Sequence, residues 1–137
     1  MTGFVLDCSI AASWCFKDQA TPQTDRLLDR ARRDGAAVPA LWSWEVANIL
    51  TIALRRARIT PSEANACLWL FALLPISIDA GSHARAWRET FQIAQAHKLT
   101  AYDAAYLELA LRLNWELATR DAALIRAAGT LGVTVLP

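Results

Sequence analysis

The stretch Phe4-Val5-Leu6-Asp7-Cys8-Ser9 places an acidic residue directly after a short apolar run. Residues 4–6 predict a strand, and residues 9–16 predict a helix that follows it closely. In an open α/β sheet, ligands bind outside the carboxyl ends of the strands. If the rest of the chain folds as such a sheet, Asp7 stands where its ligand would bind.

Strand and helix patterns alternate along all 137 residues, which is the length of one ordinary domain. The predicted strands cover residues 4–6, 37–39, 76–78, 117–118 and 133–136. The predicted helices cover residues 9–16, 22–34, 41–58, 61–73, 82–97, 101–114 and 122–128. Alternating elements imply right-handed crossovers and a parallel sheet. We therefore expect an α/β fold, a single domain over residues 1–137, whose central parallel sheet of about four to five short strands is flanked by helices.

The clearest helix start lies at Thr60-Pro-Ser-Glu63, where a threonine cap is followed by proline and by a glutamate that completes a capping box. Pro22 and Gly35 bound another predicted helix in the same manner, because proline is favoured in the first turn and glycine beyond the last. These signals place the helices independently of the apolar pattern.

Three further acids occupy positions like that of Asp7. Glu45 lies early in a long predicted helix, Asp103 lies at the start of another, and Asp121 lies between a strand and the last helix. Converging carboxylates repel one another unless a cation lies between them, and hard divalent ions such as Mg²⁺ prefer oxygen ligands. The pattern indicates a metal-dependent phosphodiester hydrolase.

Each acid alone also fits a purely structural role. Asp7 could cap the helix that begins near residue 9, and Glu45 could be a first-turn acid favoured by the helix dipole. Asp103 could belong to a capping box, and Asp121 is a good N-cap. The set favours a site, because each acid has a polar companion close in sequence: Ser9, Asn48, Thr100 and Thr119.

Four motifs stand in a fixed order along the chain: Phe4-Val-Leu-Asp-Cys-Ser9, Glu45-Val-Ala-Asn48, Tyr102-Asp-Ala-Ala-Tyr-Leu-Glu-Leu-Ala110 and Thr119-Arg-Asp121. In this order and in a chain of this length, they resemble the PIN-domain nucleases, and within them the VapC-type toxins of bacterial and archaeal toxin–antitoxin pairs. The resemblance covers essentially the whole chain. One departure is Cys8, where another small residue is expected, and it touches no acidic position.

The resemblance implies a divalent-metal-dependent endoribonuclease that acts as a toxin, with Asp7, Glu45, Asp103 and Asp121 as its catalytic acids. Mg²⁺ or Mn²⁺ would activate a water for attack on the RNA phosphodiester. We expect Asp7 and Asp103 to be the central metal ligands and Asp121 to bind the same ion or a second one. Glu45 would bind the metal directly or through water and orient the nucleophile.

Supporting roles are expected for polar residues beside the acids. Asn48 lies one helical turn after Glu45, on the same face, and would hold Glu45 or the loop of Asp7. Ser9 and Thr119 would act in the same way. Arg120 is a candidate for contact with RNA, since arginine binds phosphate in a bidentate fork.

Composition excludes several other classes of protein. The formal net charge is +1, so no overall basic field indicates nucleic-acid binding. The three cysteines are odd in number and lack a Cys-x-x-Cys or a histidine cluster, which argues against a disulfide framework and a zinc site. No signal peptide is evident, and the most apolar stretch, 66–74, is too short to span a bilayer. We expect a cytoplasmic protein with no membrane association.

Partners are expected from the resemblance and from surplus apolar residues. The resemblance implies an antitoxin whose C-terminal segment lies over the active site, and a toxin that forms a homodimer. Apolar residues concentrate in 42–54 and 67–74, and large exposed apolar patches mark protein contacts. Trp42 and Trp44 point to different faces of one helix, so one of them is expected to face a partner.

Two other kinds of function are compatible with an α/β fold of this size. A receiver domain or a dehalogenase-type phosphatase has a similar architecture, but the chain lacks a late lysine after Lys98 and has Ser9 where such a phosphatase needs a second aspartate. A catalytically silent PIN-like protein-interaction or RNA-binding module is the remaining alternative. All four acids are present, which favours the active enzyme.

Overall fold

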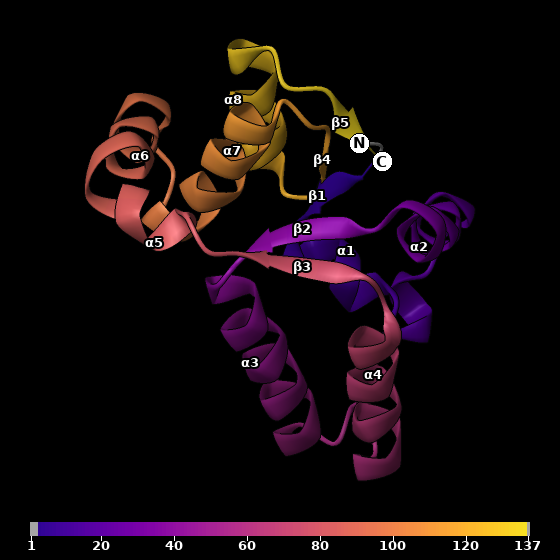
Figure 1. Ribbon diagram of the computed structural model, residues 1–137. Helices are drawn as coiled ribbons and strands as arrows, with labels where there is room; N and C mark the ends of the chain where they lie inside the picture. The colour runs from indigo at the N-terminus through magenta and orange to yellow at the C-terminus, as the bar shows by residue number, and fades with distance from the viewer. Residues whose placement is uncertain (1–2, 137) are drawn as a thin grey trace.

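The centre of the fold is a five-stranded sheet in which every strand runs parallel to its neighbours (Figure 1). The computed structural model describes residues 3–136. The strands are ordered β3-β2-β1-β4-β5, with bounds β1 Phe4–Leu6, β2 Ala36–Pro39, β3 Ile76–Asp79, β4 Leu117–Ala118 and β5 Val135–Leu136. The predicted α/β fold is confirmed, while residues 1, 2 and 137 of the predicted domain lie outside the described residues.

Helices surround this sheet, and in the view of Figure 1 α7 and α8 lie above β2 and β3, level with β4 and β5, while α3 and α4 lie below β3. The helical segments are α1 Cys8–Ser13, η1 Lys17–Gln19, α2 Pro22–Asp34, α3 Leu41–Arg55, α4 Pro61–Leu73, α5 Ser82–Arg85, η2 Ala86–Thr90, α6 Phe91–His97, α7 Ala101–Leu113 and α8 Ala122–Leu131. Within residues 3–136, none of them is both long enough and apolar enough to cross a bilayer.

The core is built around β1 and α7. All three residues of β1 are buried, because β2 and β4 flank the strand and helices pack on it. Helix α7 contacts β1, β2 and β4, and its residues 104–110 are buried without interruption. A helix with no exposed face along two turns is fixed tightly, so the side chains it carries have well-defined positions.

Helix starts agree with the sequence analysis better than helix ends do. Thr60 accepts a hydrogen bond from the amide of Glu63, and the glutamate side chain accepts one from the amide of Thr60, so the predicted capping box is confirmed. Thr21 forms the equivalent box with Thr24 at the start of α2, beside Pro22.

Several predicted boundaries were wrong. The helix predicted over 41–58 ends at Arg55, because Ala57 adopts a left-handed conformation and the chain turns away. The helix predicted over 82–97 is divided into α5, the π-helical η2 and α6. The helix predicted over 9–16 ends at Ser13, and the last strand is only two residues long.

Candidate active site

The four predicted acids come from four segments at the carboxyl edge of the sheet. Asp7 follows β1 directly, and Asp121 follows β4 and precedes α8. Glu45 lies on α3, which follows β2, and Asp103 lies in the first turn of α7. Strand β1 lies between β2 and β4, so the chain order reverses here. Ligands of open parallel sheets bind at such a reversal.

Asp7 is buried, and its carboxylate is held by two hydroxyl groups. Ser9 and Thr119 both donate hydrogen bonds to Oδ2 of Asp7, at 2.6 and 2.7 Å. Although Asp7 occupies the N-cap of α1, its side chain forms no capping hydrogen bond, so the structural explanation of this acid was wrong. The two hydroxyl groups fix the orientation of this carboxylate.

Ser9 and Thr119 also join the two loops that carry the acids. The amide of Arg120 donates to Oγ of Ser9 at 2.9 Å, and the amide of Asp121 donates to Oγ1 of Thr119 at 3.0 Å. The hydroxyl groups lie 3.4 Å apart. The loop after β1 and the loop after β4 are therefore connected through side chains that also contact Asp7.

Asp121 has the capping role that its sequence position suggested. Its Oδ1 accepts a hydrogen bond from the amide of Leu124 at 2.9 Å, which caps α8. Within residues 3–136, no hydrogen bond reaches its other oxygen. A cap uses only one carboxylate oxygen, so the capping role leaves the second oxygen available for a ligand.

Glu45 has a partner that the sequence analysis missed. The hydroxyl group of Tyr106 on α7 donates a short hydrogen bond to Oε1 of Glu45 on α3. The helix dipole explanation of Glu45 was wrong, because this residue lies beyond the first turn of α3. The signal for Tyr106 was its place three residues after Asp103, on the same face of a helix.

The acids share one electrostatic environment. Burial, followed by the nearby charges of Asp7 and Asp103, raises the pKa of Glu45 above its ordinary value, while the hydrogen bond from Tyr106 lowers it. Burial, followed by the charges of Asp121 and Asp7, raises the pKa of Asp103. The charges of Asp7, Asp103 and Asp121 therefore act on neighbouring acids of the same site.

Within residues 3–136, none of the four acids forms a salt bridge with a basic side chain. Most other acids of the described chain do form one: Asp18, Asp29, Asp34, Asp79, Glu108 and Glu116. Carboxylates that lack a basic partner fit a site that receives its positive charge from outside.

The spacing of the acids bears on the kind of cation. Among the described residues, no three His, Cys, Asp or Glu side chains are gathered closely enough to hold an ion by themselves. Such an arrangement does not fit Zn²⁺, which takes a closed set of protein ligands in structural sites. It fits Mg²⁺, which keeps several waters and binds through one or two carboxylates.

Asn48, predicted as a support, and Arg120, predicted as an RNA contact, form no hydrogen bond or salt bridge with the acid side chains among the described residues. Asn48 is exposed, and its side chain forms no hydrogen bond within the described range 3–136, so the predicted contact with Glu45 or the Asp7 loop is not formed. Arg120, directly before Asp121 in the chain, is exposed and donates a hydrogen bond to the carbonyl of Gln19 at 2.8 Å. Its guanidinium group is therefore held against η1.

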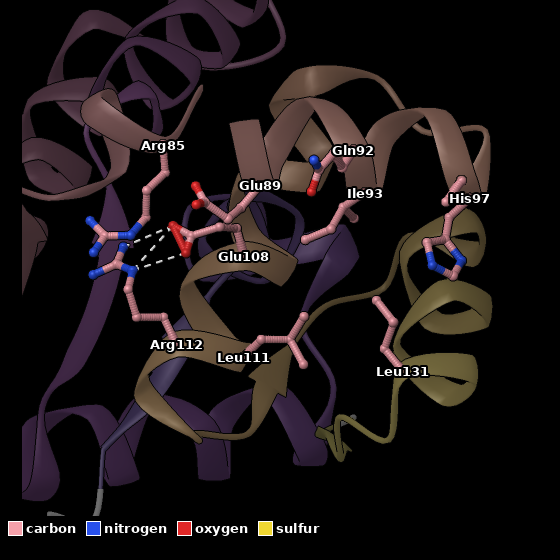
Figure 2. A pocket seen from close by; sticks show the side chains of 10 residues that line it. Arg85, Glu89, Gln92, Ile93, His97, Glu108, Leu111, Arg112 and Leu131 are labelled. Carbon is pink, nitrogen blue, oxygen red and sulfur yellow. Dashed lines mark hydrogen bonds and ion pairs between the residues drawn. The ribbon is translucent and has the colours of Figure 1, made fainter. Parts of the chain in front are cut away.

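A separate cavity of about 550 Å³ lies between α6 and α7 and contains none of the four acids (Figure 2). Its charged end holds Glu108, which accepts a hydrogen bond from Arg112 at 2.9 Å. Arg112 also donates to Asp79 at 2.6 Å, which lowers the pKa of Asp79 to about 2. Because these charges are paired internally, the acidic sheet edge is the better candidate site.

Comparison with known proteins agrees with the geometry. The PIN domain family matches residues 4–130. Ribonuclease VapC3 of Pyrobaculum aerophilum is 30% identical over 120 residues, which cover 85% of this chain and 88% of that protein. The crystal structure of PAE2754 from the same organism superposes with a TM-score of 0.69 at 20% identity, covering 98% of this chain and 90% of that one. The chain belongs to the PIN-domain family and is similar to its VapC-type ribonucleases.

Proposed function

We propose that this protein is a divalent-metal-dependent endoribonuclease that acts as the toxin of a toxin–antitoxin pair. The observation that carries the proposal is the set of four carboxylates, brought from four segments to one sheet edge without a basic partner in the described chain. Membership of the PIN family and the similarity to a VapC ribonuclease support the same activity.

The proposed reaction is hydrolysis of an RNA phosphodiester. Mg²⁺ or Mn²⁺, held directly by one or two of Asp7, Asp103 and Asp121 and through water by the rest, would lower the pKa of a bound water and neutralise the non-bridging oxygens of the phosphate. Ser9 and Thr119 orient Asp7 through their hydrogen bonds to its Oδ2.

Glu45 is proposed to orient the attacking water and accept its proton. A general base works best when its pKa approaches the working pH, and the raised pKa of Glu45 moves in that direction. Arg120 is exposed, directly before Asp121 in the chain, and is a candidate for contact with RNA phosphate. Since RNA is the proposed substrate, we place the enzyme in the cytoplasm.

An antitoxin and a second copy of the chain are the proposed partners. Helices α3 and α4 contact each other and expose large apolar side chains, including Trp44 at 77%, Trp69 at 69% and Leu73 at 78%. Trp42, by contrast, is buried, as expected for two tryptophans on different faces. An antitoxin that covers the active site is expected to bring Arg or Lys toward the acids, where it would offset their repulsion.

The proposal is tested with purified protein and a single-stranded RNA. Cleavage is expected with Mg²⁺ or Mn²⁺, to stop in excess chelator, and to return when the metal is added back. Asp7→Asn should remove activity while the fold persists. Asp18→Asn is the matched control, because Asp18 is exposed and pairs with Arg58, so its activity should be unchanged.

Undiminished cleavage in excess chelator would exclude the metal mechanism. Binding of RNA by the wild-type protein without cleavage, under every metal condition, would favour a catalytically silent PIN-like module instead.

A further inference from the structure

Tyr106 is the largest fully buried side chain of the core, with 0% of its surface exposed, yet it carries a hydroxyl group. A buried hydroxyl group is costly unless it forms a hydrogen bond. Among the described residues, its hydroxyl group bonds to Glu45 alone. Phenylalanine would fill the same space without this requirement, so the hydroxyl group is explained by Glu45 rather than by packing.

The same arrangement recurs at two of the other three acids. Asp7 is held through Oδ2 by two hydroxyl groups, and Asp121 is held through Oδ1 by a backbone amide. Glu45 is held through Oε1 by Tyr106. In all three, the described residues bond to one carboxylate oxygen and leave the other without a hydrogen bond. One oxygen fixes the orientation of the side chain, and the second remains available to bind a ligand.

Glu45 needs such a fixed donor more than the aspartates do. A glutamate side chain has three rotatable bonds, and ordering it costs more conformational entropy than ordering a shorter side chain. Glu45 is only partly buried, so without a partner its carboxylate could turn toward solvent. Tyr106 is anchored on α7, the helix that packs against β1, β2 and β4, and so provides a rigid donor.

We propose that Tyr106 is a positioning residue that orients Glu45 toward the metal and the attacking water. This inference rests on the proposed metal-dependent activity. It assigns to Tyr106 the role for Glu45 that Ser9 and Thr119 have for Asp7, and it makes α7 the source of two site functions, Asp103 as ligand and Tyr106 as support.

The test is Tyr106→Phe, measured by calorimetric titration with Mn²⁺ and by steady-state RNA cleavage. Loss of a residue that supports a metal site typically weakens metal affinity or activity roughly 10–100-fold, and we expect a change in this range. The loss should fall on Mn²⁺ affinity and kcat, while KM for RNA stays the same. Thr130→Val is the control, since it also removes one hydroxyl group, but from an exposed residue near the end of α8 that bonds to the carbonyl of Arg126, and it should behave as wild type.

A double-variant cycle separates positioning from stability. If Tyr106 acts through Glu45, Tyr106→Phe should have no further effect on Mn²⁺ affinity in the Glu45→Gln background. Unchanged Mn²⁺ affinity and kcat in Tyr106→Phe would overturn the inference, as would an equal loss in both backgrounds. Absence of metal-dependent cleavage by the wild-type protein would instead overturn the proposed function.

Should Tyr106→Phe fail to fold, Glu45→Asp provides the second test. This change keeps the charge but shortens the side chain by one methylene, which takes the carboxylate away from the Tyr106 hydroxyl group. Mn²⁺ affinity should again fall, and affinity equal to that of the wild type would refute the positioning role.

Discussion

At the scale of single residues, Asp103 distinguishes a metal ligand from a helix-terminal acid. Asp103→Asn should abolish metal-dependent RNA cleavage while the fold persists. Without metal, the variant should be more stable by up to about 1 kcal/mol, because burial of a charge and repulsion by Asp121 and Asp7 are relieved in a partly exposed group. Urea unfolding in chelator gives the stability, and full activity of the variant would refute the ligand role.

The same carboxylates predict how stability depends on pH. The pKa of Asp103 is raised above 3.8 and that of Glu45 above 4.5, so the folded state binds these protons more tightly than the unfolded state. Their contribution to stability is therefore fully present below pH about 4 and is lost as the pH rises through the raised values.

This dependence is measured by unfolding the metal-free wild type and Asp103→Asn in parallel at pH values from about 4 to about 8. The stability of the wild type relative to the variant should fall as the pH rises. Saturating Mg²⁺ should weaken this trend, because a bound cation favours the ionised forms. A difference that does not change with pH would contradict the shared environment of the acids.

At the scale of helices and strands, helix starts could be predicted more reliably than helix ends. The capping box at Thr60 and the proline at Pro22 mark helix starts in the local sequence, and Gly35 marks the end of α2. Other ends lie at left-handed residues that are not glycine, namely Ala57, Lys98 and Asn114. At Ala57, hydrogen bonds from Arg58 to Ala53 and from Ala57 to Leu54 form a Schellman motif, which ordinarily uses glycine. Alanine carries no such signal, so the helix was predicted three residues too long.

This helix end yields a stability prediction. Ala57→Gly should raise the free energy of unfolding by about 0.5–1 kcal/mol, because Ala57 has φ +53° and glycine adopts that conformation without steric cost. Ala47→Gly, at an exposed position inside α3, should lower it by about 1 kcal/mol. Thermal unfolding measures both, and destabilisation by Ala57→Gly would show that the left-handed turn is not strained.

At the scale of the whole molecule, the supports of Asp7 could be predicted but the support of Glu45 could not. Asp7 and Asp121 follow strands, and the topology of a parallel sheet brings such positions together. Ser9 and Thr119 lie two residues from these acids in the sequence, and both donate hydrogen bonds to Asp7. The contact between Tyr106 and Glu45 joins residues 61 apart, on α7 and α3, and no local pattern encodes it.

Assembly is the prediction that belongs to the whole molecule. The isolated chain should sediment as a dimer, because α3 and α4 expose apolar surface that a monomer would leave in water. Trp69→Glu, on α4, should shift the equilibrium toward monomer. Trp87→Glu is the control, since Trp87 is 93% exposed on η2 and not on these helices. A wild-type monomer at all concentrations would contradict the proposed dimer without affecting the nuclease chemistry.

The sheet order has a consequence for misassembly. The two strands with an open edge are β3, with four residues, and β5, with two. Pro75, which lacks an amide hydrogen, precedes β3, and the carboxylate of Asp79 ends it. Short edges that meet proline and charge are poor templates for strand addition. When α3 and α4 lack a partner, this protein should therefore form amorphous aggregates through their exposed apolar side chains. Fibrils with cross-β order should not grow from its sheet.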